Sequence, residues 1–180
     1  MTAAAIEIRP AVPEDADGIA RAFLESAEYH AQLDAERYSI PATETISERY
    51  REGRQHPSQA GREAVTLVAV DSDGVVGFLD AHLEQSPDPM HRAIIYCHIA
   101  EIAVRSGHRN EGIGRRLLRA AEDWGRRFGA EFALLEYHAA NKRASLFYQE
   151  RMGYSAASIT AIKRFRGVSC EFKPERGSGF

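Results

Sequence analysis

The sequence predicts one mixed α/β domain, in which helices flank a mainly antiparallel central sheet. Apolar residues recur at three- to four-residue spacing in several segments, which is typical of amphipathic helices. Runs rich in β-branched residues lie between those segments and are typical of strands. The chain has 180 residues, 44% of them hydrophobic and 27% charged, which suits a globular domain with a full hydrophobic core.

The N-terminal part of the chain predicts one strand and two helices. Residues 5–9 favour the strand, and Pro13 fits the first turn of a helix. The apolar face of that helix is formed by Ile19, Ala20, Phe23 and Ala27. A second helix is expected over residues 43–55. Residues 29–38 between them fit either a continued helix or a loop.

The middle of the chain predicts three antiparallel strands. Residues 64–70 form the first, and the turn-forming residues 71–74 lead into a hairpin partner over residues 75–83. A loop with two prolines spans residues 84–91. Residues 93–104 then form a long apolar strand.

The C-terminal part of the chain predicts further helices and strands. These are a helix over residues 112–128, a strand over 132–137, a helix over 141–151 and one or two strands over 155–172. Gly153 is expected to end the second of these helices in a left-handed cap. Residues 1–173 form the predicted domain, and residues 174–180 a flexible tail.

Composition and charge argue against several classes of function. A net charge of −3 disfavours non-specific nucleic-acid binding, and no apolar run reaches the length of a membrane span. The N-terminus has no signal-peptide pattern, and the two cysteines form no CxxC pair, which fits a cytoplasmic protein. Seven histidines show neither HxxxH nor HExxH spacing, so we expect no metal site.

A glycine-containing loop at residues 109–114 connects the long strand to the amphipathic helix. The first turn of a helix presents unpaired N–H groups and a partial positive charge. Gly112 and Gly114 allow a ligand close to the backbone, and Arg109 adds a cationic side chain, so the loop predicts a phosphate site. The loop matches neither a P-loop nor a dinucleotide-binding fingerprint. A P-loop has Lys-Ser or Lys-Thr after its second glycine, whereas Ile113-Gly114 follows Gly112, and Leu117 occupies the third glycine or alanine position of the fingerprint. A plain strand-to-helix turn remains the alternative.

The pattern R-x-x-G-x-G at Arg109, Gly112 and Gly114 resembles the acyl-CoA signature of the GNAT superfamily of N-acetyltransferases. The similarity continues at Leu117, Leu118, Ala121, Glu122, Trp124 and Gly129, and resumes at Asn141, Ala144, Phe147, Tyr148, Gly153 and Tyr154. One extra residue precedes Gly153 relative to the family pattern.

The resemblance implies an acetyl-CoA-dependent N-acetyltransferase with the acyl-CoA N-acyltransferase fold. The backbone of Ile102, Ala103 and Val104 would pair with the pantetheine arm of coenzyme A. The pyrophosphate would be held by Arg109, Asn110, Glu111, Gly112, Ile113, Gly114 and Arg115. Asn141, Ala144 and Tyr148 would also contact the cofactor, and a simple helix N-cap is the alternative role of Asn141.

The resemblance also implies a catalytic pair. Tyr148 would donate a proton or hydrogen bond to the coenzyme A sulfur, with aromatic core packing as its alternative role. Glu101 would accept the amine proton, especially if burial raises its pKa. Its rivals are Glu136, His98 and His138, and a salt-bridged structural role for Glu101 stays open.

The acceptor is predicted to be a primary amine of a small molecule. The expected acceptor contacts are Tyr29, His30, Glu101 and Glu136. A protein acetyltransferase acting on N-termini or lysines would share every cofactor motif. A non-catalytic acyl-CoA-binding regulatory module and a structural domain that binds no coenzyme A are the alternatives of other classes. The resemblance also allows a homodimer.

Overall fold

A computed structural model describes residues 5–53, 63–86 and 89–163 of the chain. Five strands form one sheet in the order β1-β2-β3-β4-β5. They are β1 (Glu7–Pro10), β2 (Ala64–Asp71), β3 (Gly74–Gln85), β4 (Ile95–Val104) and β5 (Phe132–Leu135). The first four strands pair antiparallel, and β5 joins β4 in parallel. The predicted mixed α/β class with a mainly antiparallel sheet is confirmed.

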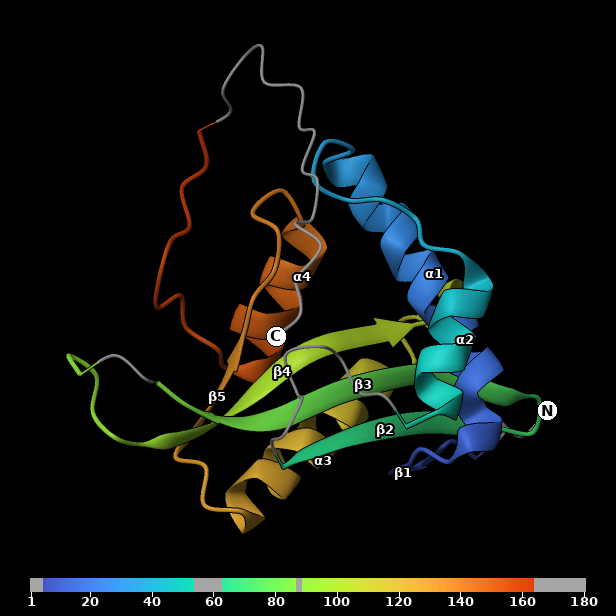
Figure 1. Ribbon diagram of the computed structural model, residues 1–180, viewed down its shortest axis with the longest axis horizontal. Coiled ribbons are helices and arrows are strands. Elements are labelled where there is room, and N and C mark those ends of the chain that lie inside the picture. The colour runs from blue at the N-terminus through green and yellow to red at the C-terminus, as the bar shows by residue number, and fades with distance from the viewer. Residues whose placement is uncertain (1–4, 54–62, 87–88, 164–180) are drawn as a thin grey trace, which may run out of the picture.

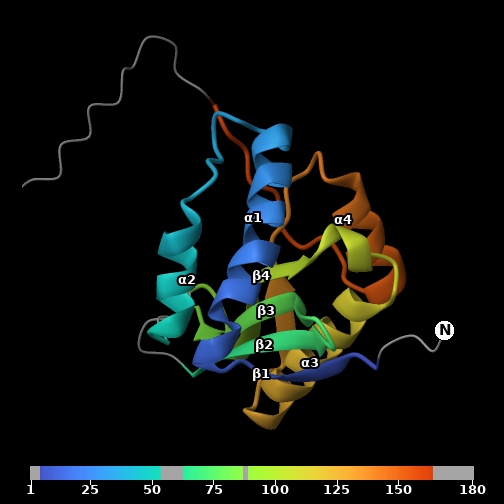
Figure 2. The same ribbon diagram turned by 90° about the vertical axis from the view of Figure 1, so that its right-hand side faces the viewer.

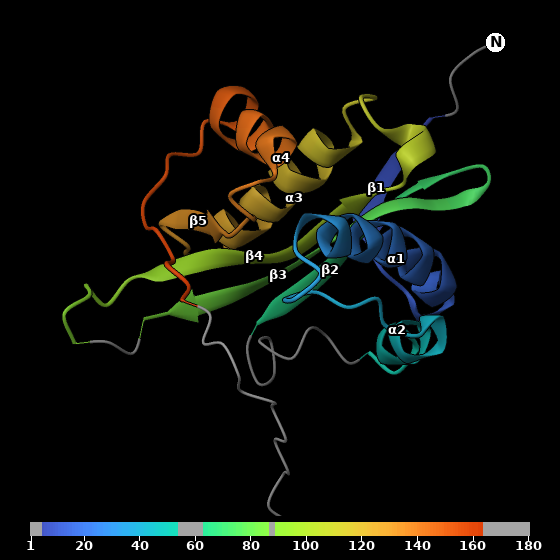
Figure 3. The ribbon, with the colours of Figure 1, turned by 90° about the horizontal axis from the view of Figure 1, so that it is seen from above.

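Helices cover both faces of this sheet. They are η1 (Pro13–Asp15), α1 (Ala16–Leu33), α2 (Thr43–Arg51), η3 (Ser106–His108), α3 (Ile113–Arg127), α4 (Lys142–Leu146) and the π-helical η4 (Phe147–Arg151). Figure 3 shows α1 and α2 on one side of the sheet and α3 with α4 on the other. The sheet is therefore the middle of three layers.

Alternation along the strands divides the hydrophobic core between these two faces. On the first face, Val68 and Phe78 pack with Ile19 of α1 and Ile46 of α2. The opposite face packs against α3 through Leu67, Ala69, Val76, Leu79, Ala81, Cys97 and Ile99. Cys97 is buried there as a small core residue. Helices pack on both faces of the sheet, and the ends of these helices surround the site described below.

Most predicted elements agree with the structure to within a few residues. Within residues 29–38, which fitted either a helix or a loop, α1 continues through Leu33 and a turn follows. The helix predicted over 43–55 ends at Arg51, and residues 54–55 lie outside the described part of the chain. Gly153 adopts a positive φ of 80°, as expected for a left-handed cap.

The prediction of strands after residue 155 is wrong over residues 155–163, which form no strand. Their side chains are largely exposed, with Ile159 at 95%, so no buried face holds this segment against the sheet. Residues 164–172 and the predicted tail at 174–180 lie outside the described residues. No helix in the described ranges has the length and apolar character needed to cross a membrane.

Candidate active site

A cleft opens where β4 and β5 separate. The two strands pair only from Tyr96 to Ile99 on β4, whereas β4 itself continues to Val104. Figure 1 shows the chain after β5 turning away from β4 toward α4. Residues 99–104 line a cleft of about 1560 Å³, into which the free edge of β4 faces. An extended ligand can add to such an edge through backbone hydrogen bonds, as a strand would.

A β-bulge in β4 sets the direction of Glu101. Asp80 of β3 lies opposite Glu101, whereas the next residue, Ala81, lies opposite Ile99. Ala100 is thus the extra residue on β4, and a bulge of this kind breaks the strand's alternation. Ile99 remains in the core beneath α3, and Glu101 shares the face of Asp80. The bulge thereby puts a carboxylate at the place where the strands part.

The glycine loop forms one end of the cleft. Asn110 and Gly112 have positive φ angles of 68° and 80°, and Gly112 is the N-cap residue of α3. No described side chain caps this helix, and its first turn contains no acidic residue. A Cβ at Gly114 would lie 3.6 Å from the ring of Phe147. The first turn therefore presents amide groups and the positive end of the helix to the cleft, as an anion site requires.

Four arginines line the cleft from the glycine loop, α3, α4 and η4, namely Arg109, Arg115, Arg143 and Arg151, and Arg49 lines it from α2. Arg109 also donates from Nε to the carbonyl of Val104 over 3.2 Å, which ties the loop to the end of β4. The sequence reasoning missed Arg143 and Arg151. Their spacing is that of an ordinary solvated helix face, and only the packing of α4 beside α3 brings them to this cleft.

Burial raises the pKa of Glu101 from 4.5 to about 7, and the negative charge of Asp80 adds to the effect. The charge of Arg49 and a hydrogen bond from Ser26 act in the opposite direction. The sequence predicted a raised pKa if this side chain were buried. A carboxylate with a pKa near neutrality can both take up and release a proton at physiological pH.

Asp80 lies fully buried beside Glu101, and sequence reasoning missed it. Its carboxylate accepts hydrogen bonds from the Tyr50 hydroxyl at 2.6 Å and from the Thr66 hydroxyl at 2.7 Å. Burial raises the pKa of Asp80 despite these bonds. A lone aspartate inside the apolar run of β3 was the available signal, since such a residue needs buried donors.

Tyr148 is buried and lines the same cleft as Glu101. Burial raises its pKa above the ordinary value of a tyrosine, and the charge of Glu101 raises it further, so the phenol stays neutral. Tyr148 lies on η4, where one π-helical turn accommodates the extra residue found before Gly153. Insertion of a residue into a helix commonly produces such a π-bulge. The amide of Tyr154 closes the turn on the carbonyl of Tyr148 at 2.9 Å.

Asn141 caps the N-terminus of α4, since its Oδ1 accepts from the amide of Ala144 at 3.0 Å. The hydroxyl of Tyr29 lies 3.5 Å from the same oxygen and connects α1 to α4. Asn141 and Ala144 both line the cleft. Figure 2 shows α1 and α4 on the two sides of β4. Residues of all three elements line the cleft.

Aromatic and acidic side chains also line the cleft. Tyr29, His30 and Tyr38 lie there, with the rings of His30 and Tyr38 5.2 Å apart. Glu136 also lines the cleft. His98 is absent from the described lining residues, and His138 lines a neighbouring pocket, where it lies 3.7 Å from Asp34. Of the rivals to Glu101, only Glu136 thus shares its cleft.

Comparison with known proteins agrees with this geometry. Residues 30–154 match the model of the acetyltransferase (GNAT) family. The chain is 29% identical over 177 residues to a streptothricin acetyltransferase of Streptomyces lavendulae, covering 92% of this chain and 89% of the relative.

Solved structures share the fold at low identity. A mutant form of a Bacillus halodurans protein superposes with a TM-score of 0.76 at 21% identity, over 88% of this chain and 99% of that one. The aminoglycoside N-acetyltransferase AAC(6')-Iy in complex with CoA gives 0.63 at 15% identity, over 91% and 97%. The chain belongs to the GNAT family of acetyltransferases and is an N-acetyltransferase.

Proposed function

We propose that this enzyme transfers an acetyl group from acetyl-CoA to a primary amine of a cationic small molecule. The division of charge within one cleft carries the proposal. Besides Arg49 of α2, Glu111 of the glycine loop and Glu136 after β5, two sets of side chains line the cleft. Arg109, Arg115, Arg143 and Arg151 form the first set with the N-terminus of α3, and Glu101 with the aromatic side chains of Tyr29 and His30 forms the second. The first set suits the phosphates of coenzyme A, and the second suits an ammonium group.

The donor binds along the open edge of β4. The backbone of Ile102, Ala103 and Val104 pairs with the pantetheine arm. Amides from Asn110 to Arg115 hold the pyrophosphate at the start of α3, and Arg109 pairs with its charge. Asn141 and Ala144 support the arm from α4. The separation of β4 from β5 and the uncapped first turn of α3 support this placement.

Transfer then needs two proton movements. Glu101 takes a proton from the substrate ammonium, directly or through water, and leaves a neutral amine. The amine nitrogen attacks the thioester carbonyl, a C–N bond forms and the C–S bond breaks. As the amide forms, its nitrogen loses a second proton, which replaces the one that the Tyr148 hydroxyl donates to the departing sulfur, so coenzyme A leaves as a thiol and Tyr148 stays neutral. A pKa of Glu101 near 7 and the neutral phenol of Tyr148 in the same cleft support these roles.

A small-molecule acceptor is favoured over a protein by the relatives. The curated relative is named for the acetylation of streptothricin, and one structural neighbour for that of aminoglycosides. The acceptor of this enzyme is accordingly an amine-bearing small molecule, contacted by Tyr29, His30, Glu101 and Glu136.

Two variants of residues that line the cleft test the proposal. Arg143→Gln should raise the KM for acetyl-CoA and leave the KM for the amine unchanged. Glu136→Gln should do the reverse. Steady-state thiol release measures both, with streptothricin, aminoglycosides, polyamines, amino acids and lysine peptides as acceptors. Equal effects of each variant on both KM values, or a preference for peptides, would refute the assignment.

A further inference from the structure

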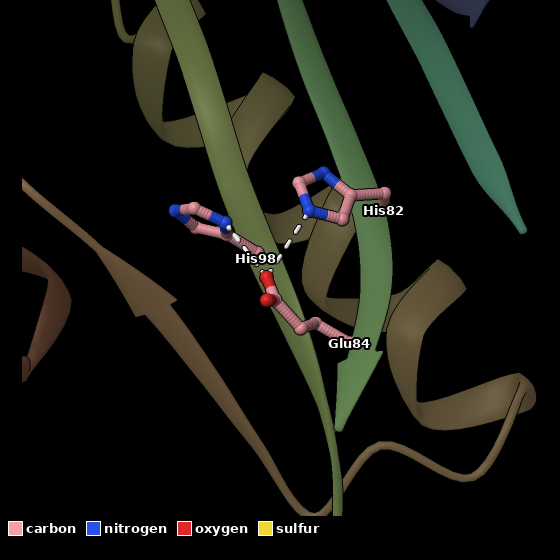
Figure 4. Close-up of side chains that lie close together, drawn as sticks. All are labelled: His82, Glu84 and His98. Carbon is pink, nitrogen blue, oxygen red and sulfur yellow. Dashed lines mark hydrogen bonds and ion pairs between the residues drawn. The ribbon is translucent and has the colours of Figure 1, made fainter. Parts of the chain in front are cut away.

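Two histidines and a glutamate converge on the sheet outside the cleft. His82 and Glu84 are two residues apart on β3, so their side chains share a face. His98 of β4 is the cross-strand partner of His82. Figure 4 shows the three side chains turned toward one another. None of the three belongs to the described lining of the acetyl-transfer cleft.

The spacing of the donor atoms fits a small divalent metal ion. His82 Nε2 and His98 Nδ1 each lie 3.3 Å from Glu84 Oε2. One ligand atom from each residue lies within 4.8 Å of the other two. Ligand atoms about 2.0–2.2 Å from a tetrahedral zinc ion lie about 3.3–3.6 Å apart, so two of the three separations already match.

The surroundings hold these donors in place and leave one side open. The His82 side chain is fully buried, whereas those of Glu84 and His98 are 20% and 22% exposed. The two imidazole rings meet edge to face, with centroids 4.8 Å apart. Nδ1 of His98 is buried, and within the described part of the chain its contact with Glu84 Oε2 is an ion pair that lacks hydrogen-bond geometry. A nitrogen in that condition is suited to a metal bond, which needs a lone pair and no proton.

We propose that His82, Glu84 and His98 bind a zinc ion, with water in the fourth position on the exposed side. Two imidazoles and a carboxylate form a donor set that zinc accepts in proteins. The ion would cross-link β3 and β4 next to the loop that joins these two strands. This proposal departs from the sequence expectation of no metal. That expectation relied on spacing within one helix, whereas two neighbouring strands supply these ligands.

Calorimetric titration of the chelator-treated full-length enzyme with Zn²⁺ tests the site. Wild type should bind one ion tightly and melt at a higher temperature with it. His98→Ala and Glu84→Gln should each weaken binding by at least about 100-fold, because even the loss of a supporting partner costs about 10–100-fold. His91→Ala is the matched control, an exposed histidine of the same β3–β4 connection, and should bind as wild type does.

Two readouts keep the test independent of acetyl transfer and of variant folding. Circular dichroism establishes that each variant is folded. Co²⁺ bound to the wild type should give the intense visible absorption of a tetrahedral site, and Zn²⁺ should displace it. Equal Zn²⁺ affinity in the wild type and His98→Ala, or no uptake by the wild type, would overturn the proposal. Glu84 would then be an ion-pair partner of the histidines alone.

Discussion

Replacement of Glu101 by glutamine should stabilise the enzyme and inactivate it. Burial raises the pKa of this carboxyl in the folded state above its value in the unfolded chain. Ionisation therefore costs folding free energy as pH rises from 4.5 toward about 7, and the cost is constant above that range. Glutamine carries no charge, so Glu101→Gln removes this cost in folding free energy.

The size of the effect follows from the two pKa values. The difference between 4.5 and about 7 sets an upper bound of about 3 kcal/mol, at about 1.4 kcal/mol for each pH unit. Because Glu101 opens onto the cleft, solvent screening reduces this to about 1–2 kcal/mol. Glu101→Gln should then raise the Tm at pH 8.5 by about 2–8 °C for a chain of this size. The gain should shrink below pH 7 and nearly vanish at 4.5.

Activity should change in the opposite direction. The kcat/KM of the wild type should rise with pH and level off above about 7, when Glu101 is ionised. Glu101→Gln should lose this dependence and about 100-fold or more in rate. Glu48→Gln, an exposed residue of α2, is the matched control and should change neither property. A retained pH profile in Glu101→Gln, or its loss in Glu136→Gln, would refute the assignment of Glu101 as the base.

Three further variants test other parts of the structure. Tyr148→Phe should lower kcat by about 10–100-fold and leave acetyl-CoA affinity in calorimetry unchanged, because the phenol acts on the leaving sulfur; unchanged turnover would remove that role. Gly125→Ala should cost about 1–3 kcal/mol in urea denaturation, because its Cβ would lie 2.6 Å from that of Cys97. Gly107→Ala, which meets nothing within 4 Å, is its control. Tyr50→Phe should cost about 1–3 kcal/mol, since buried Asp80 loses a donor; a neutral result would show that Asp80 does not need it.

Features fixed by local sequence were predictable. Helix α3 has a strong apolar face and begins at a glycine with positive φ, so both its position and its uncapped first turn follow from neighbouring residues. The cap role of Asn141 is equally local, since its side chain bonds an amide three residues on. The spacing of Tyr148 and Gly153 departed from the family pattern by one residue, and the π-helical turn of η4 shows how the chain accommodates it.

Features that depend on contacts between distant segments were not predictable. The bulge at Ala100 is visible only when β3 and β4 are in register. Asp80 and Ser26 influence Glu101 across strand and helix, at separations that no short pattern covers. The strand prediction that is wrong over residues 155–163 shows the converse case. A short β-prone stretch forms no strand where its side chains have no buried face to join.

Mass spectrometry of the acceptor after incubation with acetyl-CoA tests the central claim most directly. The proposed function predicts that streptothricin or an aminoglycoside gains one acetyl group on an amine, with one free thiol released for each product. The product should form far more slowly with Glu101→Gln, although that variant still binds acetyl-CoA. Acetyl-CoA binding without acetylation of any small-molecule amine, or acetylation of peptides alone, would contradict it.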